Sequence, residues 1–190
     1  FMIGQMARFY GVPWRTSNRL GGAKTFDAQA GYESAMTMNA VLLSGANYIW
    51  HSAGWNEAGM HCSTAKFVVD AEMCAMGYRM AEGVRWDDFD EALAAVRDVG
   101  PGGHYLGHPH TLQNFERAFF MPKLFDNNSI EQWQAEGSVE ITGRALAHAR
   151  RLLREYEEPK LDPGTDEALR DYIARREREI PAEDALNTDY

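Results

Sequence analysis

The stretch Asn47-Tyr48-Ile49-Trp50-His51 is rich in aromatic and branched residues, and a glycine-containing segment follows it at residues 52–60. This composition predicts a short buried strand that ends in a loop. Helical patterns of apolar residues lie on both sides, at residues 27–45 and 64–82. The order helix, strand, loop, helix is typical of a parallel sheet with crossover helices. We therefore predict an α/β fold.

The residues before this stretch repeat the same order of elements. Residues 1–10 have apolar side chains at helical spacing, and Gly11 marks the end of that helix. Residues 12–16 can form a second short strand, which leads into a loop at residues 17–26. In parallel α/β folds the loops at the carboxyl ends of the strands carry the chemistry. The loops 17–26 and 52–60 are therefore the candidate site.

The elements after this region are mostly helical. Ser63 is a suitable N-cap for the helix at 64–82, which is apolar on nearly all sides, so we expect it to be buried. Further along, the patterns predict helices at 87–98, 111–119 and 129–157, a last short strand at 104–106, and a highly charged helix at 165–179. We expect this last helix to be a solvated or subunit-facing tail.

Composition excludes several classes of protein. The 190 residues carry a net charge of −9, which argues against nucleic acid as a partner because phosphate neutralisation needs a basic face. No run approaches the roughly 18 apolar residues of a membrane span. The two cysteines, Cys62 and Cys74, form no disulfide framework, so we expect a cytoplasmic protein. Because the sequence starts at Phe1 within a helical pattern, we also expect it to be a fragment of a longer protein.

The loop after the central strand carries the richest set of chemical groups. His51, Trp55 and Glu57 supply an imidazole, an indole and a carboxylate around the flexible Gly54. Loops on a rigid scaffold are where functional residues concentrate. The alternative is that the histidine and the tryptophan only pack against their neighbours, and the residue types leave both interpretations open.

Aromatic residues near this loop suggest a class of ligand. Tyr48 and Trp50 precede it, and Trp14 and Trp55 add two further indoles. Rings around a pocket can hold a quaternary ammonium by cation–π attraction of roughly 0.5–2 kcal/mol each. Aromatic residues on strands are also common in protein cores, so this indication is weak by itself.

Three polar residues lie at the predicted start of the helix at 27–45. Asp27 and Gln29 stand at its beginning, where Asp27 can be the N-cap. Glu33 lies one and a half turns further along, and its carboxylate can face the site or pair with a basic residue. We carry all three as candidates.

Three histidines raise the question of a metal site. His104, His108 and His110 have a spacing that suits zinc only if the segment is helical, and Gly107 and Pro109 argue against that. We predict no bound metal.

Taken together, these segments resemble the trimethylamine methyltransferase (MttB-like) family. The resemblance is carried, in order and spacing, by Gln5-Met6-Ala7-Arg8-Phe9-Tyr10-Gly11-Val12-Pro13, Asp27-Ala28-Gln29-Ala30-Gly31-Tyr32-Glu33, Leu43-Ser44-Gly45-Ala46-Asn47, His51-Ser52-Ala53-Gly54-Trp55 and His110-Thr111-Leu112-Gln113-Asn114-Phe115. Trp133 and the closing long helix are similar too, so the resemblance covers essentially the whole chain.

The resemblance implies both a fold and a reaction. The fold is the carboxy-terminal part of a (β/α)8 TIM barrel at residues 1–125, followed by a helical tail at residues 126–190. A complete barrel needs about 250 residues, so the chain is too short to close one. The reaction moves a methyl group from a methylated amine to the Co(I) of a corrinoid (cobalamin). A partner protein supplies the corrinoid, and the chain itself binds no cofactor.

One departure from the family bears on the substrate. The trimethylamine enzymes of methanogens carry pyrrolysine near the segment that reads Gly21-Gly22-Ala23-Lys24-Thr25-Phe26 here, and this sequence has none. A quaternary nitrogen already has the charge that lets it leave, so we favour a betaine-like substrate. The alternative function is a non-catalytic fragment that serves as an interaction or oligomerisation module.

These implications give a set of candidate residues and partners. We predict catalytic roles for His51 and Glu33. We predict substrate-binding roles for Trp55, Tyr48, Asp27, Gln29, Trp14 and Glu57. The expected partners are the methylated amine, the cognate corrinoid protein and further copies of the chain.

Overall fold

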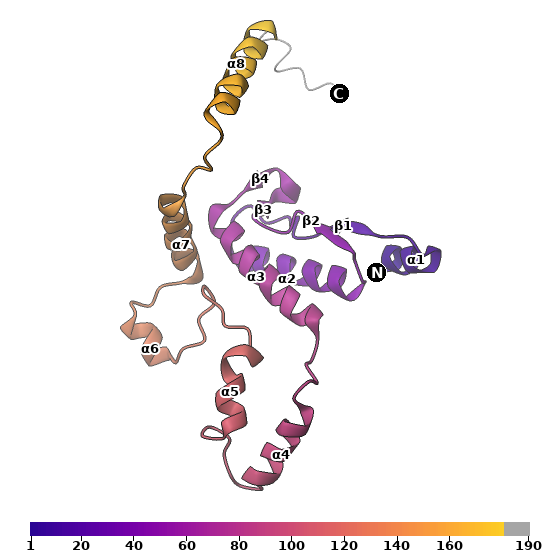
Figure 1. Ribbon diagram of the computed structural model, residues 1–190, viewed down its shortest axis with the longest axis vertical. Coiled ribbons are helices and arrows are strands. Elements are labelled where there is room, and N and C mark those ends of the chain that lie inside the picture. The colour runs from indigo at the N-terminus through magenta and orange to yellow at the C-terminus, as the bar shows by residue number, and fades with distance from the viewer. Residues whose placement is uncertain (181–190) are drawn as a thin grey trace. The chain divides into compact units, whose positions relative to one another are not determined.

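The computed structural model of the protein describes residues 1–180, drawn in Figure 1. By its internal contacts the chain divides into two compact units, Phe1–Leu153 and Arg154–Tyr190. We describe each unit by itself.

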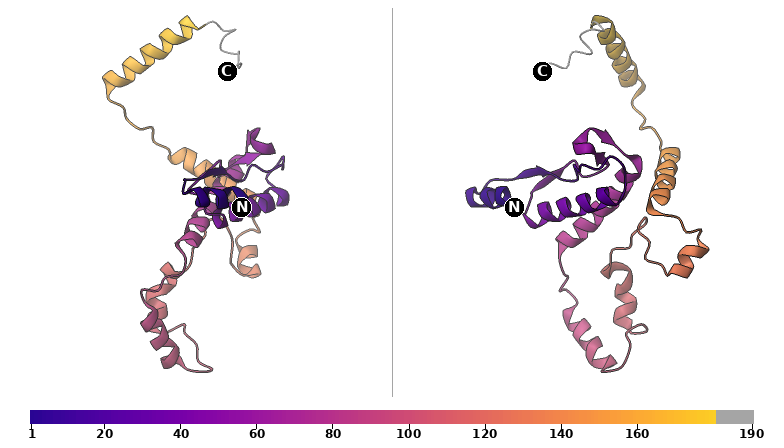
Figure 2. Two further views of the ribbon diagram at one scale, coloured as in Figure 1. Left: turned by 90° about the vertical axis from the view of Figure 1, so that its right-hand side faces the viewer. Right: turned by 180° about the vertical axis from the view of Figure 1, so that it is seen from behind.

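Two short parallel strands form the centre of the first unit. β1 (Arg15–Ser17) pairs with β2 (Tyr48–Trp50), with Thr16 opposite Ile49. The helix α2 (Ala28–Leu43) connects the two strands, and α3 (Thr64–Glu82) follows the second. Figure 1 and the rear view in Figure 2 show both helices on the same side of the strand pair. The predicted α/β order is therefore confirmed for this region, although β1 begins three residues later than expected.

The ends of the first helices follow from specific capping residues. α1 (Met2–Tyr10) ends at Gly11, which has a left-handed φ of 65° that favours glycine. α2 begins at Asp27, whose carboxylate accepts the Ala30 N–H. α3 begins at Ser63, whose hydroxyl accepts the Lys66 N–H. Both N-caps agree with the sequence.

The segment predicted as a loop at 52–60 has more structure than expected. β3 (Trp55–Asn56) pairs antiparallel with β4 (His61–Cys62), and the 3-10 turn η1 (Glu57–Gly59) joins them. Two-residue strands have no alternation of apolar and polar residues long enough to be recognised in a sequence.

The remaining elements are helices. They are α4 (Phe89–Val99), α5 (Pro109–Ala118), α6 (Ile130–Ala135), α7 (Ile141–Glu155) and α8 (Pro163–Glu179). The predicted strand at 104–106 is wrong, because these residues form no ladder. The single predicted helix at 129–157 is also wrong: it is broken at Gly137 and Ser138, both with positive φ.

The core of the first unit forms where α3 meets α7. Its buried members are Ala65, Val68, Val69, Leu124, Ala145 and Ala149. Only one face of α3 is covered, since Phe67 is 54% and Tyr78 76% exposed, so the expectation of burial on nearly all sides is wrong. Leu124 and α7 share the core of α3, and the first compact unit extends to Leu153. The division into a barrel part at 1–125 and a helical tail at 126–190 stays a prediction.

The described part of the second unit consists of the last two residues of α7, the segment that follows and the charged helix α8. All residues of α8 are described, and none of them is buried. Ion pairs such as Arg170–Asp166, with Nε and Oδ2 2.8 Å apart, lie along its surface. This matches the solvated character predicted from its charge pattern. Within residues 1–180, no helix has the length and apolar character to cross a membrane.

Candidate functional site

The parallel pairing brings the two predicted loops together at the carboxyl ends of β1 and β2. At the last residues of the strands, the Asn18 N–H donates to the Trp50 carbonyl at 3.2 Å. Next to this bond, the Ser17 hydroxyl lies 3.0 Å from Nδ1 of His51. His51 is therefore held from the neighbouring strand. The sequence analysis did not identify Ser17 as the partner of His51.

Two further backbone bonds join the loops at their outer ends. The Glu57 N–H donates to the Ala23 carbonyl at 2.9 Å, and the Ala58 N–H donates to the Gly21 carbonyl at 2.8 Å. Glu57 and Ala58 take left-handed φ values of 47° and 53° to make this contact. Such conformations cost a residue other than glycine about 1 kcal/mol or more and persist where surrounding contacts impose them. The two loops therefore form one fixed surface.

His51 is at the centre of an aromatic cluster on this surface. Its own φ is 55°, a strained value for a histidine, directly after the last residue of β2. Its ring stacks on Trp50 with centroids 5.4 Å apart and meets Trp55 edge to face at 5.8 Å. Trp50 in turn meets Tyr48 edge to face at 6.1 Å. The structure thus brings together three predicted site residues, His51, Trp55 and Tyr48.

The same cluster includes a cation that the sequence did not single out. The Arg15 guanidinium lies over the Trp50 ring, 4.9 Å from its centroid. Arg15 and Ser17 are two residues apart on β1 and are opposite Tyr48 and Trp50. Alternate residues of a strand share one face, so knowledge of the strand register would have identified Arg15 and Ser17 as neighbours of the cluster.

Trp14 is not brought to this cluster. It precedes β1, at the amino end of the strand pair, where its backbone N–H donates to Asn47 Oδ1 at 2.9 Å. Its ring packs against α1: a Cβ added at Gly4 would lie 2.7 Å from a ring carbon of Trp14. The substrate-binding role predicted for Trp14 has no support from its position.

Glu33 holds the glycine loop rather than a basic residue. Its Oε2 accepts the Ala23 N–H at 3.2 Å, and its Oε1 accepts the Gln29 side-chain amide at 2.8 Å. These two hydrogen bonds, that of Gln29 first, lower the pKa of the Glu33 carboxyl below its usual value. A Cβ at Gly21 would meet Glu33 Oε2 at 2.2 Å, so a larger residue at this position would displace the carboxylate. Glu33 and Gln29 thus shape the loop that receives Glu57.

Asp27 faces a different part of the first unit. Besides capping α2 through the Ala30 N–H, it lines a groove of about 690 Å³. The other lining side chains include Phe26, Tyr32 and Phe125. None of the residues that line this groove belongs to the His51 ring cluster.

The side chain of Glu57 points to the short hairpin. Its Oε2 lies 3.7 Å from Nδ1 of His61, and both side chains are exposed. Nε2 of His61 lies 3.0 Å from the Lys24 carbonyl, so His61 also bridges the two loops.

Buried charges lie beneath the loop that carries His51 and Trp55. Arg19 donates from Nη1 to the Ser52 carbonyl at 2.7 Å. Asp70 Oδ2 accepts the Gly54 N–H at 2.9 Å and also pairs with the Lys66 ammonium. The sequence analysis missed all three charged residues, although Lys66 and Asp70 have the spacing of a helical ion pair.

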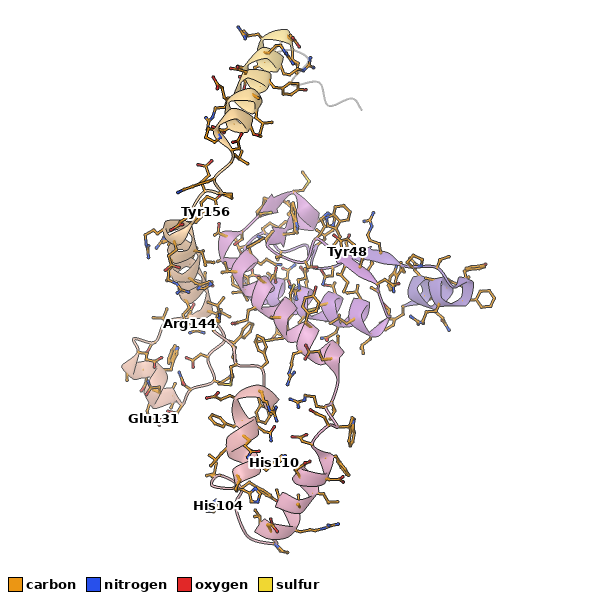
Figure 3. All side chains as sticks on the ribbon, in the orientation of Figure 1. Tyr48, His104, His110, Glu131, Arg144 and Tyr156 are labelled. Carbon is orange, nitrogen blue, oxygen red and sulfur yellow. The ribbon has the colours of Figure 1, made fainter. Side chains whose placement is uncertain are left out.

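The three histidines considered for a metal lie elsewhere. Figure 3 shows His104 and His110 at the α4–α5 hairpin and Tyr48 on the strand pair. Nε2 of His110 lies 3.3 Å from Asp88, and Nε2 of His108 lies 3.7 Å from Asp98. Residues 1–180 contain no group of three or more potential metal ligands.

Comparison with known proteins identifies the family of the chain. Residues 1–181 match the model of the trimethylamine methyltransferase (MTTB) family, and the chain belongs to that family. The resemblance found in the sequence is therefore confirmed.

Three individual relatives show how similar the chain is to named members of the family. The chain is 41% identical over 179 residues to a glycine betaine methyltransferase of Desulfitobacterium hafniense strain Y51, covering 94% of this chain and 37% of that protein. It is 29% identical over 177 residues to the trimethylamine methyltransferase MttB of D. hafniense strain DCB-2, covering 93% and 35%. A similar match, 29% over 160 residues, covers 84% of this chain and 32% of MttB from Methanosarcina barkeri strain Fusaro. The chain thus spans about a third of the length of these relatives.

Proposed function

We propose that the chain contributes the substrate-binding loops of a methyltransferase that acts on a betaine-like quaternary amine. The observation that carries the proposal is the aromatic cluster around His51, held by the Ser17 hydroxyl at 3.0 Å. Membership of the trimethylamine methyltransferase family and the 41% identity to a protein named glycine betaine methyltransferase support the reaction and the choice of substrate.

The chemistry of the leaving group explains what the site must do. A methyl group leaves a quaternary nitrogen without its bonding electrons, and the nitrogen keeps the pair and becomes a neutral amine. No proton has to be supplied, because the positive charge is already fixed on nitrogen. The residues around the substrate therefore need to hold it and orient one methyl group, a task of positioning. Ring faces such as those of Trp55 and Tyr48 suit the cationic end.

His51 is suited to the other end of a betaine. When the Ser17 hydroxyl donates to Nδ1, the neutral imidazole carries its proton on Nε2 and can donate it to a substrate carboxylate. The left-handed φ of 55° fixes the direction in which the ring leaves the strand. Binding of a carboxylate by His51 and of the ammonium by the rings would orient the zwitterion.

The methyl acceptor in this proposal is the Co(I) corrinoid of a partner protein. Its chemistry is that of a strong nucleophile that takes the methyl group from nitrogen. Further copies of the chain and a cytoplasmic location remain part of the same proposal.

We also propose that β1 and β2 are two strands of a (β/α)8 barrel whose other strands lie in the remaining length of such proteins. The parallel register, the crossover through α2 and the position of the loops at the carboxyl ends support this. So does the exposure of Tyr48 and Trp50, which two strands alone leave uncovered.

Replacement of His51 tests the proposed function in the full-length protein. His51→Asn keeps a residue that tolerates the left-handed conformation, whereas His51→Ala adds backbone strain. Both variants should raise the dissociation constant for glycine betaine about tenfold or more, as expected for loss of a hydrogen bond of roughly 1.5 kcal/mol to a charged group. Isothermal titration calorimetry measures this, and His104→Ala is the control histidine variant. Unchanged affinity with a large loss of stability would show that His51 only packs.

A second assay addresses the substrate and the acceptor. The full-length enzyme, a corrinoid protein reduced to Co(I) and either glycine betaine or trimethylamine should give methylation of the corrinoid. We expect turnover of glycine betaine to be faster. Faster turnover of trimethylamine overturns the choice of substrate, and no turnover of either overturns the interpretation as an enzyme and favours an interaction module.

A further inference from the structure

The buried cluster beneath the site carries an unbalanced charge. Arg19, Lys66 and Asp70 are 1%, 2% and 1% exposed, which is rare for charged residues. Within residues 1–180, Asp70 is the one acidic partner of both cations, so two positive charges face one negative charge. By residue type, the formal charges of the three side chains sum to +1.

This cluster is in direct contact with the site loop. Arg19 Nη1 donates to the carbonyls of Ser52 at 2.7 Å and Asp70 at 2.6 Å. Asp70 Oδ2 accepts the Gly54 N–H at 2.9 Å. The loop residues between His51 and Trp55 are therefore separated from the buried charges by a single hydrogen bond. No bulk water lies between them to screen the field, because the charged side chains are almost completely buried.

We propose that the excess positive charge of Arg19, Lys66 and Asp70 makes the site select amines that carry a carboxylate over amines that do not. The inference rests on the proposed function and names what decides the substrate class at the same site. A positive potential beneath His51 attracts the carboxylate of a betaine and repels a ligand whose only charge is the ammonium. The aromatic rings alone cannot make this distinction, because both kinds of amine present a methylated ammonium group to them.

Gly54 explains why the charge can act at such close range. Its φ of +81° and its approach to Phe67, where a Cβ would lie 3.0 Å from the Phe67 Cβ, let the loop backbone lie directly on α3. Lys66 and Asp70 belong to the same face of α3, one turn apart. The charge is thus built into the helix that supports the loop.

A pair of ligands and a pair of variants test the proposal in the full-length protein. Glycine betaine and tetramethylammonium share the quaternary nitrogen, and only the first has a carboxylate. Lys66→Met removes one positive charge and brings the cluster to zero. Lys66→Met combined with Asp70→Asn restores +1 and keeps an amide oxygen that can accept the Gly54 N–H. The measured quantity is the ratio of the two dissociation constants by calorimetry.

The expected ratios follow the charge and not the number of lost contacts. In Lys66→Met the preference for glycine betaine should fall about tenfold, the effect of one poorly screened charge acting at close range. In the double variant the preference should return to that of the unaltered protein. A purely structural role predicts the opposite order, with the double variant the more impaired of the two.

The possible failures are distinguishable. If the unaltered protein binds neither ligand, the proposed function is overturned and this inference with it. If the protein binds both ligands and the ratio is the same in all three proteins, the proposed function stands and the role of the buried charge is overturned. Circular dichroism identifies a variant that does not fold. If Lys66→Met does not fold, Lys66→Gln replaces it, with the same expected and opposing ratios.

Discussion

The site loops and the α4–α5 hairpin differ in how they are held. The stretches 18–27 and 51–54 have little regular structure, yet carboxylates accept their backbone N–H groups at Ala23 and Gly54. The hairpin is regular helix on both sides, yet the side-chain contacts that hold it are exposed or half-buried. They include the His108–Asp98 and His110–Asp88 pairs and a hydrogen bond from Arg79 to the Arg117 carbonyl. Regular secondary structure and tertiary fixation are thus separate properties in this protein.

The physical reason is the number of backbone groups that need partners. A helix satisfies its own N–H and C=O groups, whereas a loop leaves them free to bond to other segments. Where those partners are charged and buried, the loop is fixed more firmly than a helix that rests on solvent-exposed contacts. Apolar side chains such as Trp86 and Phe115 remain exposed on the hairpin region. The comparison therefore predicts a large effect at Asp70, the buried carboxylate beneath the loop. It predicts small effects where the supporting groups are partly exposed, on the hairpin and at Glu33.

The largest effect is expected at Asp70. Asp70→Ala removes the acceptor of the Gly54 N–H and leaves Arg19 and Lys66 as buried cations without their acidic partner. Breaking a buried pair in this way costs about 3–5 kcal/mol of unfolding free energy. Urea denaturation followed by circular dichroism measures it. The matched control is Asp87→Ala, which removes an exposed aspartate paired with Arg85 and should change stability little. Equal effects of the two substitutions would contradict the comparison.

A smaller effect is expected at Glu72. This carboxylate on α3 accepts the backbone N–H groups of Lys123, Leu124 and Phe125, at 2.9 Å for Leu124 and 3.0 Å for Phe125. Glu72→Ala should lower the unfolding free energy by about 1.5–3 kcal/mol, the range for hydrogen bonds to a charged group. Hydrogen exchange should accelerate at those three amides first. Unchanged protection at residues 123–125 would show that the core contact of Leu124 suffices to hold the segment.

The same contrast explains what the sequence could predict. Helix ends are set by residues that are close in the sequence. Asp27 and Ser63 mark the starts of α2 and α3, and Gly11 marks the end of α1. The sequence predicted each of these boundaries. The break between α6 and α7 was missed because Ser138 adopts a positive φ that its residue type does not announce.

The site was predicted only in part for a related reason. His51, Trp55 and Tyr48 were identified because aromatic and imidazole side chains are concentrated in one short stretch, the strand at 48–50 and the loop after it. The structure brings them together. Ser17 and Arg19 are equally close to the loop, but they reach it across 34 and 33 residues of sequence. Contacts of that range depend on strand register and on the packing of α3, which no local pattern encodes.

On the hairpin, the effect of removing the histidines should be small. His108→Gln combined with His110→Gln deletes both contacts to aspartate, yet we expect a loss of about 1 kcal/mol or less, because partly exposed ion pairs contribute little. Thermal unfolding of the double variant measures it. A loss as large as that of Asp70→Ala would mean that the hairpin is as firmly held as the loops.

The smallest effect is expected at Glu33, and it should depend on pH. Hydrogen bonds from Gln29 and Ala23 lower the pKa of this carboxyl in the folded protein from its ordinary value of 4.5. A group whose pKa is lower in the folded than in the unfolded state adds stability above the unfolded value, and this is lost as the pH falls through the folded value. Glu33→Gln should therefore destabilise the protein slightly at pH 7 and flatten the decline in stability below about pH 4.5.

The control variant is Glu131→Gln. Hydrogen bonds from its own backbone N–H and from Ser129 lower the pKa of the Glu131 carboxyl too, but its substitution should leave hydrogen exchange at Ala23 unchanged. For both variants, the thermal midpoint is measured from neutral to acidic pH, and hydrogen exchange is measured at the Ala23 amide. An unaltered pH profile and unaltered exchange in Glu33→Gln would show that Gly21 and Ala23 keep their conformation without the carboxylate, held by the backbone bonds from Glu57 and Ala58 alone.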